Sequence, residues 1–369
     1  MFHTASLDAV MRAHQSILML CAGSFFGAPA FADIDPVSGI DMVTIGAAGN
    51  APWQGNGTPF DQTIGRGSVG YEYRIGKFEV STANWVEFYN AAYDRPPADW
   101  IPYVLPPQED GWTAFQVPAN TPGGLRWGYS PGAGMRPVGE ISWHEAAIYC
   151  NWLHNGKSLD RSAFLNGAYD VSTFTPQGFT DQEAHHPGAL YWIPTLDEWL
   201  KAVHYDPNKL NGDGSVGGWW IQPNMSDTPL TYGPPGIGDA NAGWFAGQYP
   251  GFNPRSTLLG AYPNVQTPWG LLDAAGGAAE WTQDIRSIHS TFVQRYVDGS
   301  FFGSNSLEAL EVDQLQRISG GPVNEHQPGI GLRIAAAVPS PGSAMFLAAA
   351  IAVLGRRARI ARLCTSEVR

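Results

Sequence analysis

Apolar and polar residues alternate along two short stretches, which is the pattern of a half-buried β-strand. The stretches are residues 71–75 and 77–80, and Gly76 between them is typical of a bulge. The period then changes to that of a helix, which we expect to begin at Ser81 or Thr82. The apolar positions of this helix, three or four residues apart, are Trp85, Phe88, Tyr89 and Ala92.

Two further helices are predicted where a serine or threonine precedes a glutamate by three positions. Ser142 with Glu145, and Thr195 with Glu198, form capping boxes that satisfy backbone donors at a helix start. The first box is followed by one apolar stripe at helical spacing, made of Trp143, Ala146, Ala147, Cys150 and Leu153. Beyond the second box, residues 205–220 are rich in Gly and Asn and predict a surface loop.

The three cysteines of the chain lie far apart in the sequence. Cys21 and Cys364 belong to the two ends, so Cys150 is the single thiol of the central region. No disulfide can form within that region, because a disulfide needs two partners. Burial raises the pKa of a thiol and makes it unreactive. We therefore do not expect Cys150, on its apolar stripe, to act as a nucleophile.

The first 32 residues have the pattern of a secretory signal peptide. Arg12 precedes an apolar stretch at residues 17–26, and the small-x-small sequence of residues 30–32 is typical of a cleavage site. The alternative is a buried N-terminal helix. We expect residues 1–32 to be a signal peptide, and hence the protein to be exported.

The C-terminal end combines a proline motif, an apolar run and arginines. Residues 338–342 read Val-Pro-Ser-Pro-Gly, residues 344–354 are apolar, and residues 356–359 contain three arginines. The run is shorter than the roughly 20 residues of a stable transmembrane helix. This order resembles the PEP-CTERM sorting signal of Gram-negative bacteria, which implies processing by an exosortase and transient membrane anchoring. An ordinary tail anchor is the alternative, and it also predicts export to the cell envelope or surface.

Composition adds that the chain is rich in loops and acidic. The 369 residues include 44 Gly and 29 Pro, and 15% are charged, so we expect one large domain with many turns. The formal net charge is −12. It becomes −16 without residues 1–32, which hold one base and one acid, and residues 356–369, which hold five bases and one acid. Such acidity argues against nucleic acid as a partner, because phosphates need basic side chains.

Two carboxylates flank a run of very small residues in the segment 270–284. All residues between Asp273 and Glu280 are Ala or Gly, which leaves backbone carbonyls accessible. Ca²⁺ prefers carbonyl and carboxylate oxygens at about 2.3–2.6 Å, so the segment is a candidate cation site. The alternative is a glycine-containing turn whose acids are solvated or cap backbone donors.

Four blocks of sequence resemble, in the right order, the sulfatase-modifying-factor family. That family contains the formylglycine-generating enzymes and many relatives without their activity. The blocks lie at residues 71–82, 137–153, 191–199 and 262–281, and residues 331–333, Gly-Leu-Arg, follow them.

This resemblance implies an irregular, C-type-lectin-like α+β fold, with small antiparallel sheets, few helices and much loop. The family domain would occupy residues 33–337. It would lie between the signal peptide, residues 1–32, and the sorting segment, residues 338–369.

The resemblance also implies a structural Ca²⁺ site in the segment 270–284. Two side chains and two backbone carbonyls would bind the ion, those of Asp273, Glu280, Gly276 and Ala278. Gly277 and Ala279 depart from the Asn and Trp that are usual in the family, although neither is an expected ligand. The resemblance also implies a second Ca²⁺ site near Asn241.

The cysteines that serve formylglycine-generating enzymes have no counterpart here. Those enzymes hold copper with a cysteine pair, whereas residues 298–333, the corresponding region, contain no cysteine. Carboxylates and carbonyls replace thiolates poorly as ligands of Cu(I). We therefore expect neither copper nor oxidase activity. The sequence also lacks a recognisable catalytic triad or phosphate-binding glycine loop.

Two functions from different classes remain. The first is a non-catalytic surface or extracellular binding module with polysaccharide as a partner, because tryptophan rings can stack on sugars. Tryptophans in loop-like sequence contexts are Trp127, Trp219, Trp220 and Trp244. The alternative is a formylglycine-generating or related oxidase with displaced metal ligands.

Overall fold

The computed structural model describes most of the domain predicted at residues 33–337. The described ranges are residues 33–105, 115–116, 127–242, 249–304, 311–327 and 329–339, all within the unit Ala32–Arg369. The predicted signal peptide and nearly all of the predicted sorting segment lie outside these ranges. Among the described residues, no helix has the length and apolar character needed to cross a membrane.

A five-stranded antiparallel sheet takes its strands from both ends of the domain. Its strands, in spatial order, are β1 (Asp33–Ile34), β2 (Asp41–Ile45), β3 (Tyr73–Gly76), β13 (Ala335–Ala336) and β6 (Tyr191–Trp192). β13 pairs with β3 on one side and with β6 on the other, because Ala335 lies opposite both Ile75 and Trp192. The last strand of the domain, β13, therefore connects β1, β2 and β3 to β6 within this sheet.

A four-stranded sheet is built around a long hairpin. Its strands, in spatial order, are β11 (Ser319–Pro322), β10 (Val293–Asp298), β9 (Ala279–Ile288) and β12 (Ile330–Gly331). β12 pairs with β9 in parallel, with Gly331 opposite Glu280. A side chain at position 331 would collide with the carbonyl oxygen of Val138, so this close approach requires glycine.

Two small hairpins complete the strands of the described residues. β4 (Phe115–Gln116) pairs with β5 (Trp127–Gly128), and β7 (Tyr205–Leu210) pairs with β8 (Val216–Trp219). The prediction of a surface loop at residues 205–220 is therefore wrong. Gly and Asn form the turn of this hairpin, where Gly214 N donates to Asn211 O at 3.0 Å. Most positions of β7 and β8 are polar or glycine and at least partly exposed, so the strands show no alternation of apolar and polar residues. The same residue types are common in loops, which explains the wrong prediction.

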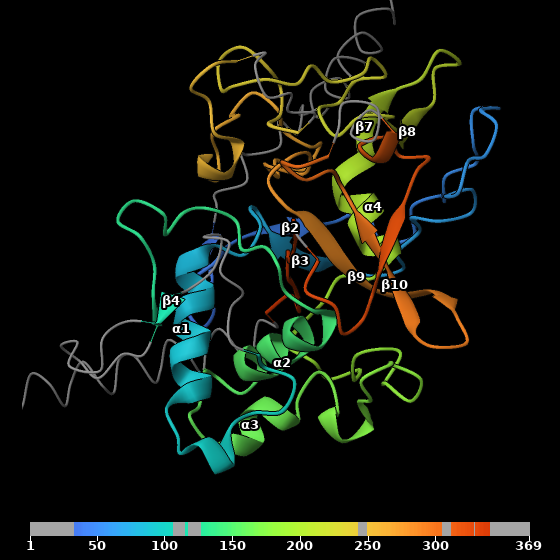
Figure 1. The fold of residues 1–369 in the computed structure, drawn as a ribbon. Helices are drawn as coiled ribbons and strands as arrows, with labels where there is room; N and C mark the ends of the chain where they lie inside the picture. The colour runs from blue at the N-terminus through green and yellow to red at the C-terminus, as the bar shows by residue number, and fades with distance from the viewer. Residues whose placement is uncertain are drawn as a thin grey trace, which may run out of the picture. The chain divides into compact units, whose positions relative to one another are not determined.

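Four α-helices lie wholly within the described residues, and three of them gather in one region (Figure 1). They are α1 (Thr82–Tyr93), α2 (Trp143–His154), α3 (Arg161–Leu165) and α4 (Leu196–His204). Short 3₁₀ helices occupy Pro97–Asp99, Val171–Thr173 and Pro254–Ser256. α4 packs mainly against β7 and β9. Small sheets, few helices and long irregular connections confirm the predicted α+β class.

The predicted helix starts are confirmed. Ser81 caps α1 by accepting a hydrogen bond from Asn84 N, and both predicted capping boxes form at α2 and α4. The second half of the predicted strand is not part of the sheet, because β3 ends at Gly76. Val80 N instead donates to Leu332 O at 2.7 Å, so the segment leaves β3 and runs beside a different part of the chain.

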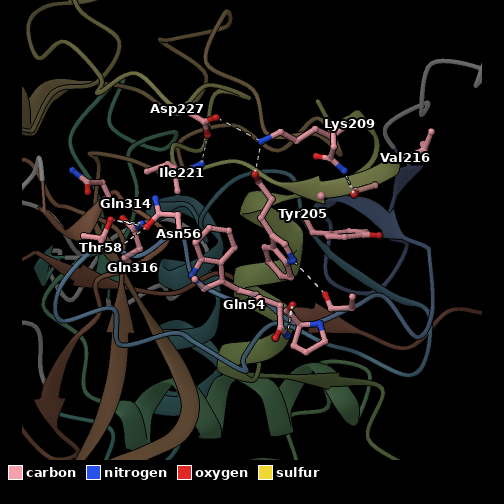
Figure 2. Close-up of a pocket in the computed structure, with 18 residues that line it drawn as sticks. Gln54, Asn56, Thr58, Tyr205, Lys209, Val216, Ile221, Asp227, Gln314 and Gln316 are labelled. Atoms are coloured by element: carbon pink, nitrogen blue, oxygen red, sulfur yellow. Dashed lines mark hydrogen bonds and ion pairs between the residues drawn. The ribbon is translucent and has the colours of Figure 1, made fainter. Parts of the chain in front are cut away.

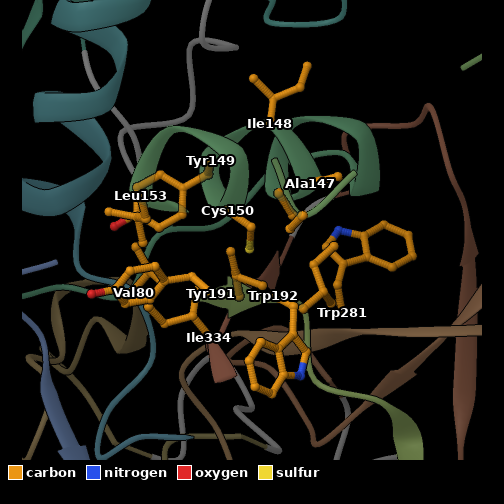
Figure 3. Close-up of a cluster of buried hydrophobic side chains, with 14 of the residues drawn as sticks. Val80, Ala147, Ile148, Tyr149, Cys150, Leu153, Tyr191, Trp192, Trp281 and Ile334 are labelled. Carbon is orange, nitrogen blue, oxygen red and sulfur yellow. The ribbon is translucent and has the colours of Figure 1, made fainter. Parts of the chain in front are cut away.

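The main core lies between α1, α2 and the five-stranded sheet (Figure 3). Ring centroids of Trp85 and Tyr149 are 5.2 Å apart, and those of Phe88 and Trp152 are 5.7 Å apart. Cys150 is fully buried in this core, and burial raises the pKa of its thiol. Its predicted place in the core is confirmed.

Candidate functional site

The segment 270–284 leads into β9 and is held by Arg333. This guanidinium is fully buried. Its Nε lies 3.0 Å from both carboxylate oxygens of Glu280, and its Nη2 lies 2.8 Å from Oε1. The remaining N–H groups donate to the carbonyl oxygens of Gly76, Lys77, Leu272 and Asp273. One side chain thus joins the end of β3, the segment and β9.

Glu280 does not fit the calcium ligand that the family resemblance implies. Both of its carboxylate oxygens accept hydrogen bonds from Arg333, and Oε2 also accepts one from Trp199 Nε1 at 2.6 Å. The carboxylate is buried, and the guanidinium already supplies the positive charge beside it. A second cation at this carboxylate would be repelled by Arg333. Glu280 is therefore a structural partner of Arg333.

Asp273, Gly276 and Ala278 lie together on the loop before β9. Asp273 Oδ2 accepts a hydrogen bond from Gly260 N at 2.6 Å. Burial raises the pKa of Asp273 to about 6, although the Gly260 amide and the charge of Arg333 act in the opposite direction. The amides of Gly276 and Ala278 donate to Ser300 Oγ and Glu79 Oε1, respectively. This loop is thus held through its N–H groups by side chains from elsewhere in the chain.

Two side chains from distant positions contact this loop, Asn241 and Glu79. Asn241 Oδ1 accepts a hydrogen bond from Gly277 N at 2.7 Å, so the predicted second calcium position adjoins the first. Glu79 is only 2% exposed. In the sequence it alternates with apolar residues and resembles a surface acid. The only cue in the sequence is the glycine at position 277. A side chain there would collide with the Glu79 carboxylate, so the glycine indicates that another group packs closely against the loop.

A second, larger site is an open cavity of about 780 Å³ between the β7–β8 hairpin and the N-terminal part of the domain (Figure 2). Three aromatic residues contribute to its wall, Trp53, Tyr205 and Trp219. Amide side chains add hydrogen-bonding groups, those of Gln54, Asn56, Asn211, Gln314 and Gln316. This cavity has the lining of a site for a polar organic ligand.

The aromatic wall of this cavity is fixed by contacts. Trp53 Nε1 donates to Asp61 Oδ2 at 2.7 Å, and Trp219 Nε1 donates to Ala51 O at 3.3 Å. The rings of Tyr205 and Trp219 meet edge to face, with centroids 5.2 Å apart. Each indole N–H is already bonded, and both indoles are more than nine-tenths buried, so only a small apolar edge of each ring faces the cavity.

The charged side chains that line the cavity are Lys209 and Asp227, and they face each other. Their Nζ and Oδ2 atoms are 3.7 Å apart. Lys209 also lies over the ring of Trp220, with 3.7 Å between Nζ and the ring centroid. One base and one acid leave the lining with no net charge. The cavity therefore differs from the acidic chain as a whole and suits an uncharged ligand.

The tryptophans predicted as candidates for ligand stacking lie in different environments. Trp219 lines the cavity, whereas Trp220 is not part of its lining and lies under Lys209. Trp127 packs in the core against Tyr89, with ring centroids 5.7 Å apart. Trp244 lies outside the described residues. Trp53, which the sequence analysis did not single out, lines the same cavity as Trp219. It lies on the long connection between β2 and β3, which runs beside the β7–β8 hairpin.

Comparison with known proteins identifies the family of the domain. Residues 66–338 match the model of the "Sulfatase-modifying factor enzyme 1-like domain". A comparison with curated proteins finds no match.

Solved structures with similar architecture include CarF, Treponema denticola variable protein 1 and PvdO from Pseudomonas aeruginosa. CarF has 18% sequence identity and a TM-score of 0.47, with 81% of this chain and 98% of CarF covered. The Treponema protein has 16% identity and a TM-score of 0.46, with 81% and 95% covered. PvdO has 14% identity and a TM-score of 0.47, with 84% and 99% covered.

The family match spans most of the chain and includes the blocks that carry the sequence resemblance. It begins shortly before β3 and ends just after β13, so it takes in α1 to α4 and most of both sheets. The chain therefore belongs to the sulfatase-modifying factor enzyme 1-like family.

Proposed function

We propose that this protein is a non-catalytic binding protein that takes an uncharged, hydroxyl-rich ligand, such as a segment of polysaccharide, in the large cavity. The observation that carries the proposal is the lining of that cavity. It combines aromatic rings, several amides and one neutral ion pair. Sugars are recognised by stacking of their apolar faces on rings and by hydrogen bonds to their hydroxyl groups.

The size of the cavity supports this proposal. Its volume of about 780 Å³ lies within the range of roughly 300–1,000 Å³ that is common for small-molecule sites. Gln54, Asn56 and Thr58 are exposed along its wall and are available to an incoming ligand.

The non-catalytic part of the proposal rests on the sequence. Residues 298–333 contain no cysteine, so the thiolate pair of the oxidases has no equivalent there. Co-expression with a cysteine-type sulfatase, followed by mass spectrometry of the target peptide, tests this. We expect no formylglycine above background, and its formation would favour an oxidase with displaced ligands.

The binding proposal is tested with a glycan array and with titration calorimetry on the glycans that bind. Gln54→Ala removes an amide from the wall, and we expect about tenfold weaker affinity, which corresponds to about 1.4 kcal/mol. Gln266→Ala is the matched control. Both amides are exposed, and each donates to the carbonyl oxygen of a proline two or three residues earlier. Absence of glycan binding, or equal losses in both variants, would contradict the proposal.

We further propose that the protein acts outside the cytoplasm, on the cell surface or beyond it. The predicted signal peptide at residues 1–32 and sorting segment at residues 338–369 support export, with an exosortase-type enzyme as processing partner. Expression in a Gram-negative host that contains such an enzyme, followed by mass spectrometry of both termini, tests this. We expect a mature N-terminus at Asp33 and a C-terminus near Pro341. Recovery of the intact chain from the cytoplasm would oppose it.

A further inference from the structure

The two ends of the described domain lie side by side, joined by Arg74. Its Nη2 forms an ion pair with Asp35 Oδ2 at 2.9 Å, and its Nε donates to Ala337 O at 3.0 Å. Asp35 is the third residue after the predicted signal peptide, residues 1–32, and Ala337 directly precedes the predicted sorting segment, residues 338–369. One guanidinium therefore joins the places where the two end segments meet the domain.

The start of β6 holds the same two ends from another side. Tyr191 Oη donates to Asp35 Oδ1, and Ala337 N donates to Leu190 O at 3.0 Å. Both side-chain oxygens of Asp35 are thus bonded, one to Arg74 and one to Tyr191. Segments from the beginning, the middle and the end of the domain meet at this junction.

Three large apolar side chains are exposed around this junction. They are Ile34, Leu190 and Val338, which are 61%, 51% and 40% exposed. Each is the chain neighbour of a residue that makes the contacts described above. Single exposed apolar residues are common on protein surfaces, whereas a group of them at one place indicates contact with another surface. We call these three residues the junction face.

The acid at this junction does not oppose contact with lipid. The chain has a net charge of −12, and an acidic surface is repelled by the anionic lipids of a membrane. Asp35, however, is buried and paired with Arg74. Residues 186–188, His-Pro-Gly, are exposed shortly before Leu190 and include no acid. These residues therefore offer apolar surface with no exposed carboxylate.

The length of chain between this face and the two apolar runs is short. The C-terminal run, residues 344–354, begins six residues after Val338, which is at most about 22 Å of extended chain. The N-terminal run, residues 17–26, ends eight residues before Ile34, at most about 29 Å away. Whenever either run lies in a bilayer, the junction face is therefore close to the lipid.

We propose that the junction face lies on the lipid surface of the membrane that holds the ends of the chain, with Ile34, Leu190 and Val338 at the boundary between headgroups and acyl chains. The proposal rests on the proposed export, because an exported chain meets the membrane through these ends. An eleven-residue run covers about 17 Å as a helix, little more than half of the roughly 30 Å hydrocarbon core. Stable anchoring then needs a second attachment, which the junction face supplies.

Fluorescent labels on single cysteines show which face of the domain meets the lipid. The full chain carries Cys21→Ser and Cys364→Ser, and Cys150 does not react because it is buried. It is reconstituted into vesicles of phosphatidylethanolamine and phosphatidylglycerol, with and without a lipid that carries a nitroxide quencher below its headgroup. We expect a label at Leu190→Cys to lose most of its emission to the quencher, and a label at Leu210→Cys to lose none.

Matched variants separate contact from simple proximity. Leu210 is the control because it is also an exposed leucine, on the β7–β8 hairpin, which belongs to neither of the two larger sheets. Ile34→Cys is a second probe of the junction face and serves if Leu190→Cys does not fold. Gly-Ser spacers of about 20 residues, inserted after Ala32 and after Pro339, lengthen each tether by roughly 25 Å. We expect quenching at the junction face to persist with these spacers, since its apolar side chains have their own affinity for lipid.

Three results would overturn the proposal. Equal quenching at Leu190 and Leu210, or quenching at neither, would show that the domain has no preferred face toward the membrane. Loss of quenching at Leu190 with the spacers would show that short tethers alone bring this face near the lipid. An emission change at Leu190 that depends on protein concentration and not on lipid would assign the face to a second copy of the chain. The vesicles contain no exosortase and involve no transport, so these results leave the export test by mass spectrometry unaffected.

Discussion

At the scale of single residues, Arg333 has the densest set of contacts around the candidate site. It binds both oxygens of Glu280 and four backbone carbonyls. The sequence placed Arg333 in a family motif, yet nothing local indicates its partner, which lies 53 positions away. The pairing depends on the parallel contact of β12 with β9, a long-range feature without a sequence period.

Replacement of Arg333 by lysine should destabilise the fold. Lysine keeps the positive charge but cannot donate in the planar, forked arrangement that these acceptors require. We expect the free energy of unfolding to fall by about 3 kcal/mol in denaturant titrations. Arg66→Lys is the control. Arg66 also bonds two carboxylates, but its side chain is 31% exposed, and exposed pairs contribute about 0–1 kcal/mol. Similar losses in the two variants would show that the buried geometry is unimportant.

At the scale of elements, local signals predicted the helices better than the strands. The capping boxes at Ser142 and Thr195 set α2 and α4 correctly, because a cap and its helix are contiguous in the chain. Strands β6, β12 and β13 are two residues long, too short to show alternation. Their pairing comes from distant segments. The large cavity was likewise unpredictable, since it joins Trp53 to a hairpin about 160 residues later.

The connection between β11 and β12 should make stability depend on pH through His326. Its Nε2 lies 2.9 Å from Glu145 Oε2, in the capping box of α2. Burial lowers the pKa of His326, but contact with Glu145 and the charge of Glu140 outweigh it and raise the pKa above the usual value of about 6.5. This pair therefore stabilises the fold fully below about pH 6.5, and the contribution is lost as pH rises through the raised pKa.

Chemical denaturation across pH 5 to about pH 9 measures this effect. His326→Gln should remove the part of the slope that lies above about pH 6.5, and His289→Gln, at an exposed histidine, should not. An identical pH profile for the parent chain and His326→Gln would show that the ion pair does not contribute.

At the scale of the whole domain, residues 329–337 complete both sheets. β12 adds to the four-stranded sheet through β9, and only a few residues later β13 enters the five-stranded sheet between β3 and β6. The strands β1 to β3 would otherwise have no connection to β6 within their sheet.

Truncation tests this role of the last strands. A chain that ends at Arg333 lacks β13, and we expect it to lose cooperative unfolding and near-ultraviolet circular dichroism, because β3 and β6 lose their shared partner. A chain that ends at Pro339 keeps β13 and should unfold like the full-length protein. Cooperative unfolding of the shorter chain would mean that the helical core holds the sheet together unaided.

The central place of β13 also sets the order of events when the protein is made. Synthesis proceeds from the N-terminus, so β1, β2, β3 and β6 all leave the ribosome long before residues 335–336 exist. The five-stranded sheet cannot close during that time. We propose that the protein is exported, and this delay would keep the chain unfolded when translocation begins. The five-stranded sheet would then close only after the chain has crossed the membrane.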